Sequence, residues 1–158
     1  MRIRLTVNGT TTERDVEPRR LLSDVLRQDL GLFGVHLGCE HGVCGACTVL
    51  VDGLPSRSCL MLAAMAEGHE ITTVEGLGTP ESPHPVQEAF AEAHGLQCGF
   101  CTPGFVVAVS ELAGRSAELS DDELREELSG NVCRCTGYVN IVLAARIAEN
   151  KLKEIQRD

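Results

Sequence analysis

The sequence predicts an α+β protein in two parts, with strands in the first half of the chain and helices in the second. Apolar residues alternate in short runs up to residue 74, and they recur at helical spacing from residue 86 onwards. The eight cysteines divide evenly between the two halves. Between these groups lies segment 76–85, which is the densest run of glycine and proline in the chain and therefore predicts a linker.

The first half is expected to form a small sheet crossed by one helix. Asn8-Gly9 and Asp52-Gly53 are strong turn signals, and each is flanked by residues typical of strands. We expect strands at residues 3–7, 10–16, 48–51 and 71–74, a return strand running from Asp52-Gly53 towards Cys59, and a helix over residues 21–26.

The second half is expected to form a bundle of four short helices. These cover residues 86–93, 103–113, 120–128 and 138–155. Ser120 with Glu123 has the pattern of a capping box at the start of the third helix. Thr102 and Thr136 each follow a cysteine, and we expect them to cap helices whose N-termini converge on one centre.

The charge, the hydropathy and the cysteine content of the chain exclude several classes of function. The chain has 158 residues and a formal net charge of −9, which argues against nucleic acid or an anionic membrane surface as the main partner. No apolar run approaches the roughly 20 residues of a membrane helix, and the N-terminus lacks the apolar core of a signal peptide. A cytosolic location is therefore expected, where eight cysteines indicate metal binding rather than disulfides.

The first group of cysteines has the spacing of plant-type 2Fe–2S ferredoxins. Four residues separate Cys39 from Cys44, two separate Cys44 from Cys47, and Cys59 lies further along the chain. Glycines between these cysteines let the loop fold tightly, so that backbone N–H groups can point at sulfur. Such donors stabilise an anionic cluster and tune its potential.

The second group matches no ordinary ferredoxin. Cys98 and Cys101 form one close pair, and Cys133 and Cys135 form another. Taken alone, these four cysteines suit a structural zinc ion about as well as an iron–sulfur cluster, because zinc uses similar pairs. Converging helix N-termini favour an anionic cluster, since the helix dipole is positive at that end. The helix dipole alone does not distinguish a zinc ion from an iron–sulfur cluster at this site.

Considered together, the two groups resemble the iron–sulfur subunit of the molybdenum hydroxylase (xanthine oxidase) family. The matching stretches are Gly38-Cys-Glu-His-Gly-Val-Cys-Gly-Ala-Cys47, Gln97-Cys-Gly-Phe-Cys-Thr-Pro-Gly104 and Gly130-Asn-Val-Cys-Arg-Cys-Thr-Gly-Tyr138, in family order. The resemblance covers essentially the whole chain. It implies a β-grasp 2Fe–2S ferredoxin-like domain at residues 1–78 and a four-helix-bundle 2Fe–2S domain at residues 84–158.

The resemblance also implies the cluster ligands. The first 2Fe–2S cluster would be held by Cys39, Cys44, Cys47 and Cys59, and the second by Cys98, Cys101, Cys133 and Cys135. Gln97 and Cys135 would lie near the pterin of a partner subunit. No residue of this chain is expected to be catalytic.

By the same resemblance, the chain is an electron-transfer subunit of an oxidoreductase. Single electrons would pass from a molybdopterin centre through the second cluster and then the first to FAD. A large partner subunit would carry the molybdopterin, in a dinucleotide form, and a medium subunit would carry the FAD. A dimer of such heterotrimers is expected. Substrate contacts belong to the large subunit, so this sequence does not determine the substrate.

Two other functions compete with this interpretation: a free-standing ferredoxin-type carrier, and a non-redox zinc-binding interaction module. The five histidines show no mutual ligand spacing, so we expect them to be structural or solvated. Phe100, Phe105 and residues 106–109 are expected in the hydrophobic core. Arg134 lies between two cysteines, where it could offset cluster charge or form a salt bridge with a partner subunit.

Overall fold

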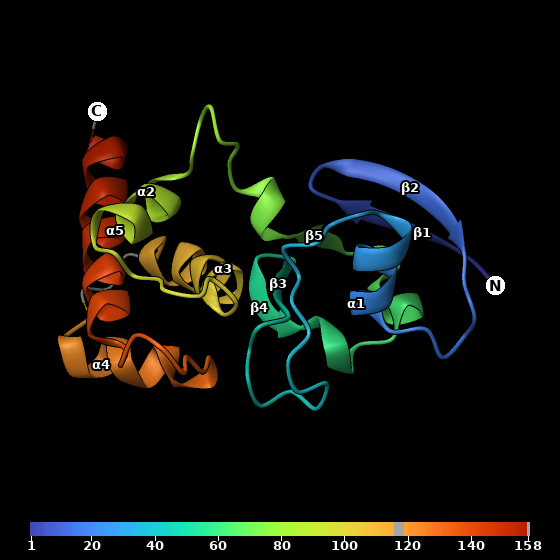
Figure 1. Cartoon of the computed structure of the whole chain (residues 1–158). Helices are drawn as coiled ribbons and strands as arrows, with labels where there is room; N and C mark the ends of the chain where they lie inside the picture. Colours follow the sequence, from blue (N-terminus) through green and yellow to red (C-terminus); the bar gives the residue numbers. More distant parts are fainter. Residues whose placement is uncertain (116–118, 158) are drawn as a thin grey trace.

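A computed structural model describes residues 1–115 and 119–157, and it has the predicted order of strands followed by helices. The sheet and the main helices form two neighbouring bodies, with the N-terminus at the far side of the sheet and the C-terminus at the end of the last helix (Figure 1). The α+β prediction is confirmed. Within the described residues, no helix is long and apolar enough to cross a membrane.

The N-terminal sheet has five strands in the order β2-β1-β5-β3-β4. They are β1 (Arg2–Val7), β2 (Thr10–Asp15), β3 (Thr48–Val51), β4 (Leu54–Arg57) and β5 (Glu70–Thr72). β1 pairs parallel with β5, and the other pairs are antiparallel. Both predicted hairpin turns are present, and positive φ angles at Asn8, Gly9, Asp52 and Gly53 give them the left-handed backbone that two-residue hairpins require.

The helix expected at residues 21–26 is present in an unusual form. One α-helical turn, α1 (Leu22–Asp24), continues into a π-helical turn over Val25–Asp29. The side chains of Leu22, Val25 and Leu26 are fully buried in one core with the sheet residues Ile3, Leu5, Val49 and Ile71. Short 3₁₀ turns follow at Ser58–Leu60, Ala63–Ala66 and Val74–Gly76.

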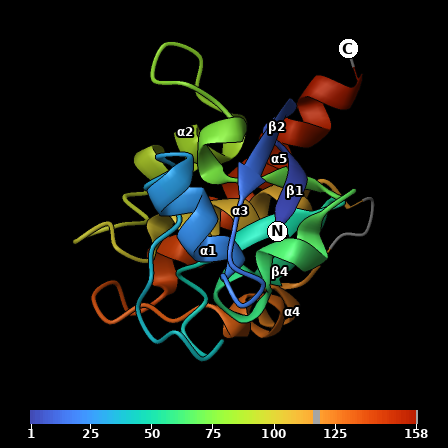
Figure 2. The same ribbon diagram turned by 90° about the vertical axis from the view of Figure 1, so that its right-hand side faces the viewer.

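The C-terminal half contains the four predicted helices. They are α2 (Pro85–Glu92), α3 (Thr102–Ala113), α4 (Asp121–Glu127) and α5 (Val139–Arg157), with a 3₁₀ turn at Leu128–Gly130. α5 contacts each of the other three helices, and its C-terminal end projects beyond them (Figure 2). A second core, separate from that of the sheet, is built around Phe90, Phe105 and Ile141.

Capping boxes mark the N-termini of α2 and α4. The predicted capping box is present at α4, because the Glu123 N–H donates to Ser120 Oγ (3.3 Å) and the Ser120 N–H donates to Glu123 Oε2 (2.7 Å). A second box at α2 was not predicted. There the Val86 N–H donates to His84 Nδ1, and burial lowers the pKa of His84, which favours the neutral ring that can accept this bond.

The prediction that Thr102 and Thr136 cap helices was wrong. α3 is preceded by Cys101 without a side-chain cap, and the Thr102 hydroxyl is buried with no hydrogen-bond partner. The Thr136 hydroxyl accepts from the Tyr138 N–H ahead of α5 and donates to Cys133 Sγ. Cys101 therefore lies directly at a helix N-terminus, whereas Cys135 lies in a loop several residues before α5.

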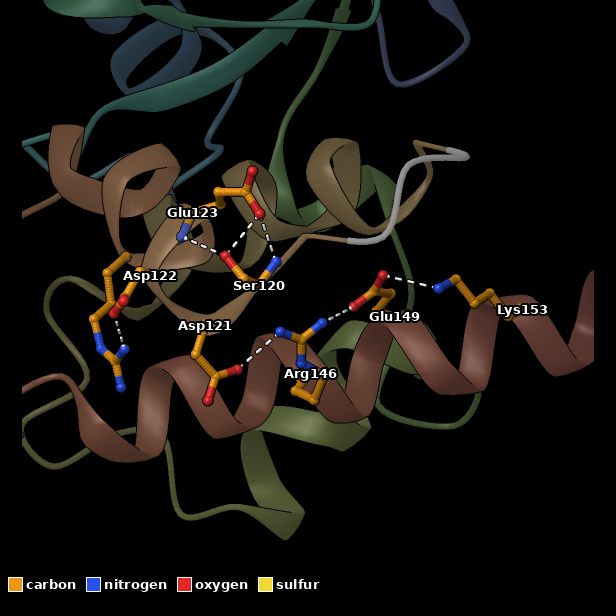
Figure 3. Close-up of polar contacts among 8 residues, drawn as sticks. Ser120, Asp121, Asp122, Glu123, Arg146, Glu149 and Lys153 are labelled. Atoms are coloured by element: carbon orange, nitrogen blue, oxygen red, sulfur yellow. Dashed lines mark hydrogen bonds and ion pairs between the residues drawn. The ribbon is translucent and has the colours of Figure 1, made fainter.

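A buried carboxylate joins α4 to α5 (Figure 3). Glu149, on α5, is 5% exposed and accepts from Arg146 Nη1 (2.6 Å) and Lys153 Nζ (2.9 Å). Arg146 also donates to Asp121 Oδ1 at the start of α4 (2.8 Å). Since α4 leads into the loop that bears Cys133 and Cys135, this network supports the position of two cysteines.

Glu149→Ala should destabilise the protein by about 2 kcal/mol, because it removes the carboxylate that neutralises two cations and leaves them partly buried. Glu154→Ala is the matched control on the exposed face of the same helix, and it should change stability by less than about 0.5 kcal/mol. Chemical denaturation of both variants would compare them. Equal stabilities would contradict a structural role for the network.

Candidate metal centres

The first group of cysteines surrounds one end of the β3–β4 hairpin. Cys39 and Cys44 lie in the loop that leads to β3, and Cys47 directly precedes that strand. Cys59 lies in the 3₁₀ turn after β4. The β3–β4 hairpin places Cys47 and Cys59 side by side. Two hydrogen bonds hold them there, since the Ser58 N–H (3.3 Å) and the Ser58 hydroxyl (2.8 Å) both donate to the Cys47 carbonyl.

Backbone donors surround the sulfur of Cys39. The N–H groups of Cys44 (3.4 Å) and His41 (3.5 Å) both donate to Cys39 Sγ. These bonds lower the pKa of Cys39 to about 6, so that its thiolate form, the form that binds metals, is favoured near neutral pH. Gly42 supports this tight loop with a φ of +83°, and a Cβ there would lie 2.5 Å from Leu60 Cδ1.

The other side of this centre is apolar. Cys47 and Cys59 are buried within the core of the sheet. Burial, together with the neighbouring Cys47 side chain, raises the pKa of Cys59 to about 11. A thiolate is therefore unfavourable at Cys59 unless a cation offsets its charge, which is the situation at a metal ligand.

The second group of cysteines also has an outer and an inner pair. Cys98 and Cys135 are exposed, and their sulfurs lie 3.6 Å apart. Cys133 is buried and Cys101 is partly buried. Burial, together with the adjacent Cys133, raises the pKa of Cys101 to about 12. Residues that are more than thirty positions apart in sequence thus form one compact sulfur cluster at the start of α3.

Cys133 Sγ has donors of its own. The Thr136 N–H (3.4 Å) and hydroxyl (3.1 Å) both point at this sulfur. Burial is the largest single influence and raises the pKa of Cys133, but the hydrogen bonds, led by those from Thr136, lower it overall. The Cys133 N–H donates to the Tyr138 hydroxyl (3.0 Å), which anchors the turn that presents the sulfur.

These residues fit a two-iron cluster better than a single zinc ion. A zinc site needs four ligands about 2.3 Å from one ion. Among the residues that the structure describes, no three His, Cys, Asp or Glu side chains converge closely enough to hold one metal ion. N–H and O–H donors aimed at sulfur are what an anionic iron–sulfur centre requires, and the partnerless Thr102 hydroxyl adds an unused polar group beside Cys101.

The two centres touch through Phe100. This residue was expected in the core, but it is 46% exposed, whereas Phe105 is fully buried as predicted. The Phe100 ring stacks on His36, with centroids 4.9 Å apart, and His36 Nδ1 donates to the Phe100 carbonyl (2.6 Å). A Cβ on Gly38 would lie 3.2 Å from Cys44 Sγ and 3.3 Å from the Phe100 ring, so this ring reaches the first cysteine loop.

Gln97 and Arg134 are both exposed, and each is next to a cysteine of the second centre in the chain. Leu96, Val132, Tyr138 and Val139 are exposed apolar residues nearby in the chain. No local pattern in the sequence indicated the contacts of His36, Thr136 or Tyr138, because each contact depends on how loops fold onto one another.

Comparison with known families supports two iron–sulfur regions. Residues 5–73 match the family described as "2Fe-2S iron-sulfur cluster binding domain", and residues 73–146 match the family described as "[2Fe-2S] binding domain". The second match excludes the zinc-binding interaction module as the better interpretation of the helical half.

Whole-chain relatives are subunits of oxidoreductases. The chain is 55% identical over 147 residues to the caffeine dehydrogenase subunit gamma of Pseudomonas sp. strain CBB1, covering 91% of this chain and 88% of that protein. It is 50% identical over 146 residues to the nicotine 6-hydroxylase small subunit of Paenarthrobacter nicotinovorans, covering 92% and 88%.

Solved structures give the same result. A chain of quinoline 2-oxidoreductase from Pseudomonas putida 86 superposes with a TM-score of 0.92 at 47% identity, covering 98% of this chain and 96% of that one. Aldehyde oxidoreductase from Desulfovibrio gigas also superposes with a TM-score of 0.92, at 44% identity, but the match covers only 17% of that longer chain.

Two 2Fe–2S clusters predict about four iron atoms and about four acid-labile sulfides per chain, with negligible zinc. Metal analysis and sulfide determination on the purified protein would measure this ratio. Two iron atoms accompanied by one zinc would contradict a cluster in the helical half and leave a ferredoxin joined to a structural zinc domain.

Proposed function

The chain belongs to the small iron–sulfur subunits of the molybdenum hydroxylase family, and we propose that its two cysteine groups each bind one of the two clusters. Cys39, Cys44, Cys47 and Cys59 bind the first cluster, and Cys98, Cys101, Cys133 and Cys135 bind the second. The observation that carries this proposal is that the eight cysteines lie in two compact groups, each with hydrogen-bond donors aimed at one of its sulfurs, Cys39 Sγ in the first and Cys133 Sγ in the second. When bound, a 2Fe–2S cluster accepts and releases one electron at a time.

The protein's own residues shape each site. The N–H groups of His41 and Cys44 offset negative charge at Cys39, and the hydroxyl of Thr136 does so at Cys133. Burial of Cys47 and Cys59 keeps water from the inner side of the first site. These contacts stabilise the more negative, reduced state to different degrees at the two sites, which sets their potentials apart.

Electrons enter at the second site and leave from the first. The exposed pair Cys98 and Cys135 would present the second site to a large partner subunit carrying molybdopterin in a dinucleotide form, and Gln97 and Cys135 would lie near that pterin. Exposed apolar residues close to this pair in the chain suit a subunit contact rather than solvent. The first site would pass the electrons on to FAD held by a medium subunit.

A fixed subunit is a better proposal than a free-standing ferredoxin. Two of the relatives are named as a subunit gamma and a small subunit, and the aldehyde oxidoreductase contains the matching region within one longer chain. We infer a dimer of heterotrimers, a cytoplasmic location where cysteines stay reduced and available to bind clusters, and two domains at residues 1–78 and 84–158. Relatives named for caffeine, nicotine and aldehydes are all similar to this chain, which supports the proposal that the large subunit selects the substrate.

Thr136→Val should lower the reduction potential of the second cluster, because it deletes the hydroxyl that donates to Cys133 Sγ. A bond worth on the order of 1 kcal/mol in the reduced state corresponds to roughly 40 mV for a one-electron couple. Thr136→Ser, which retains the hydroxyl, is the control. Redox titration followed by EPR would measure both clusters, and an unchanged second potential in Thr136→Val would refute this role.

Cys101→Ser in a complex that still folds and retains its molybdenum should stop substrate electrons from reaching the first cluster and the flavin. Cys47→Ser should instead allow reduction of the second cluster while the flavin stays oxidised. The reason is that each break isolates every later centre in the chain of electron transfer. Freeze-quench EPR after one addition of substrate would show the order. Rapid flavin reduction in Cys101→Ser would mean that the path bypasses the second cluster, and the proposed order would then be wrong.

A further inference from the structure

The turn between Cys98 and Cys101 is held by a histidine from the first half of the chain. Phe100 lies in this turn, and its carbonyl accepts a hydrogen bond from His36 Nδ1 (2.6 Å). The Phe100 ring also stacks on the His36 ring, with 24° between the ring planes. One side chain of the first half thus holds both the backbone and the ring of the residue next to Cys101.

His36 is itself fixed within the first half. The preceding residue, Val35, is buried in the core of the sheet. The π-helical turn after α1 carries Arg27, whose Nη1 donates to the carbonyls of Val35 (2.6 Å) and Phe33 (3.1 Å). Because the backbone that leads to His36 is held in this way, its ring meets the Cys98–Cys101 turn from a fixed position.

An arginine from the first half holds the other cysteine segment. Arg57, on β4, donates from Nη2 to the carbonyl of Gly130 (2.5 Å), which lies three residues before Cys133. Its Nη1 donates to Thr48 Oγ1 (2.7 Å), a buried hydroxyl on the neighbouring strand β3. A Cβ on Gly130 would lie 2.8 Å from Arg57 Nη2, so a larger residue there would displace the guanidinium.

The two segments that carry the second group of cysteines have little regular structure of their own. Segments 95–101 and 131–138 lie outside the helices and strands. Their backbone groups therefore lack the regular partners that a helix or a sheet supplies, and need donors and acceptors from elsewhere. For Phe100, and for Gly130 just before the second segment, the donor comes from the first half.

The first centre is supported within its own half. The Ser58 N–H and hydroxyl both donate to the Cys47 carbonyl. Asn131 of the second half donates to the Gly45 carbonyl (3.0 Å), but that carbonyl also accepts from the Thr48 N–H (3.1 Å). Gly45 therefore keeps a partner without Asn131, and the second centre depends on the first half more than the first centre depends on the second half.

We infer that His36 and Arg57 are positioning residues for the second cluster, so that the first half of the chain completes the second site. This inference rests on the proposed ligand assignment. His36 fixes the turn between Cys98 and Cys101. Arg57 fixes the backbone ahead of Cys133. Ligands that are already held in place lose less conformational entropy when they bind metal, so the site retains its cluster more firmly.

Substitutions of His36 separate its hydrogen bond from its ring contact. His36→Phe keeps a ring without the donor, His36→Asn keeps an N–H donor without the ring, and His36→Ala removes both. The full chain in its complex, loaded with both clusters, is incubated with an iron chelator, and the EPR signal of each cluster is followed. The signal that is missing in Cys133→Ser identifies the second cluster, and the first signal should persist in that variant.

His36→Ala and His36→Phe should lose the second signal at least several-fold faster than the parent protein, and His36→Asn should stay close to the parent. Arg57→Ala should also speed this loss, and Arg57→Lys should restore part of the stability, since its amine still reaches a single acceptor. The first signal should decay at the parent rate in all of them. His69→Ala and Arg14→Ala are the matched controls, because these side chains bond only to Asp52 and within β2, and neither should change either signal.

Decay of the second signal at the parent rate in His36→Ala or in Arg57→Ala would overturn the inference, and so would equal acceleration of both signals. If the alanine variants fail to fold, the comparison of His36→Phe with His36→Asn decides, and equal decay in these two would overturn it. A parent protein with only one 2Fe–2S signal, or with iron still bound after substitution of several of the eight cysteines, would instead refute the proposed function.

Discussion

The structure depends on a close approach between two cysteine-bearing loops, one from each half of the chain. A Cβ on Gly104, at the start of α3, would lie 2.4 Å from the Gly45 carbonyl, and a Cβ on Gly45 would clash with Gly130 and Asn131. Glycine at these positions lets backbone pack against backbone. The separation of the two centres is therefore set by direct main-chain contact, and flexible side chains have little influence on it.

Each centre lies at the edge of its own small core. Cys47 and Cys59 belong to the core of the sheet, and Cys133 belongs to the core of the helical half. Cores of this size supply limited stability by themselves, so the proposed binding of metal by these cysteines would also stabilise the fold of each half. The hydrogen bonds of Glu149 and Arg146 also stabilise the second centre, although they lie away from it, because they hold α4 and hence the loop that follows it.

The two centres have a similar distribution of hydrogen-bond donors and burial around their sulfurs, although their folds differ. In each centre one sulfur accepts hydrogen bonds, Cys39 in the first and Cys133 in the second. Each centre also has one thiol whose pKa is raised mainly by burial, Cys59 in the first and Cys101 in the second. Donors favour negative charge on one side, and the apolar surroundings oppose it on the other. This asymmetry is built from backbone amides and a nearby hydroxyl.

The sequence by itself determined the elements and the composition of the centres. Hairpin turns at Asn8-Gly9 and Asp52-Gly53, the capping box at Ser120 and the spacing of the cysteines are all local patterns, so they could be recognised without a fold. Only the tertiary structure decided how the halves meet. Phe100 belongs to the contact between loops instead of the core, and Arg57 reaches Gly130 across most of the chain. Such contacts form when two separately built cores are packed together, and no periodicity along the chain encodes them.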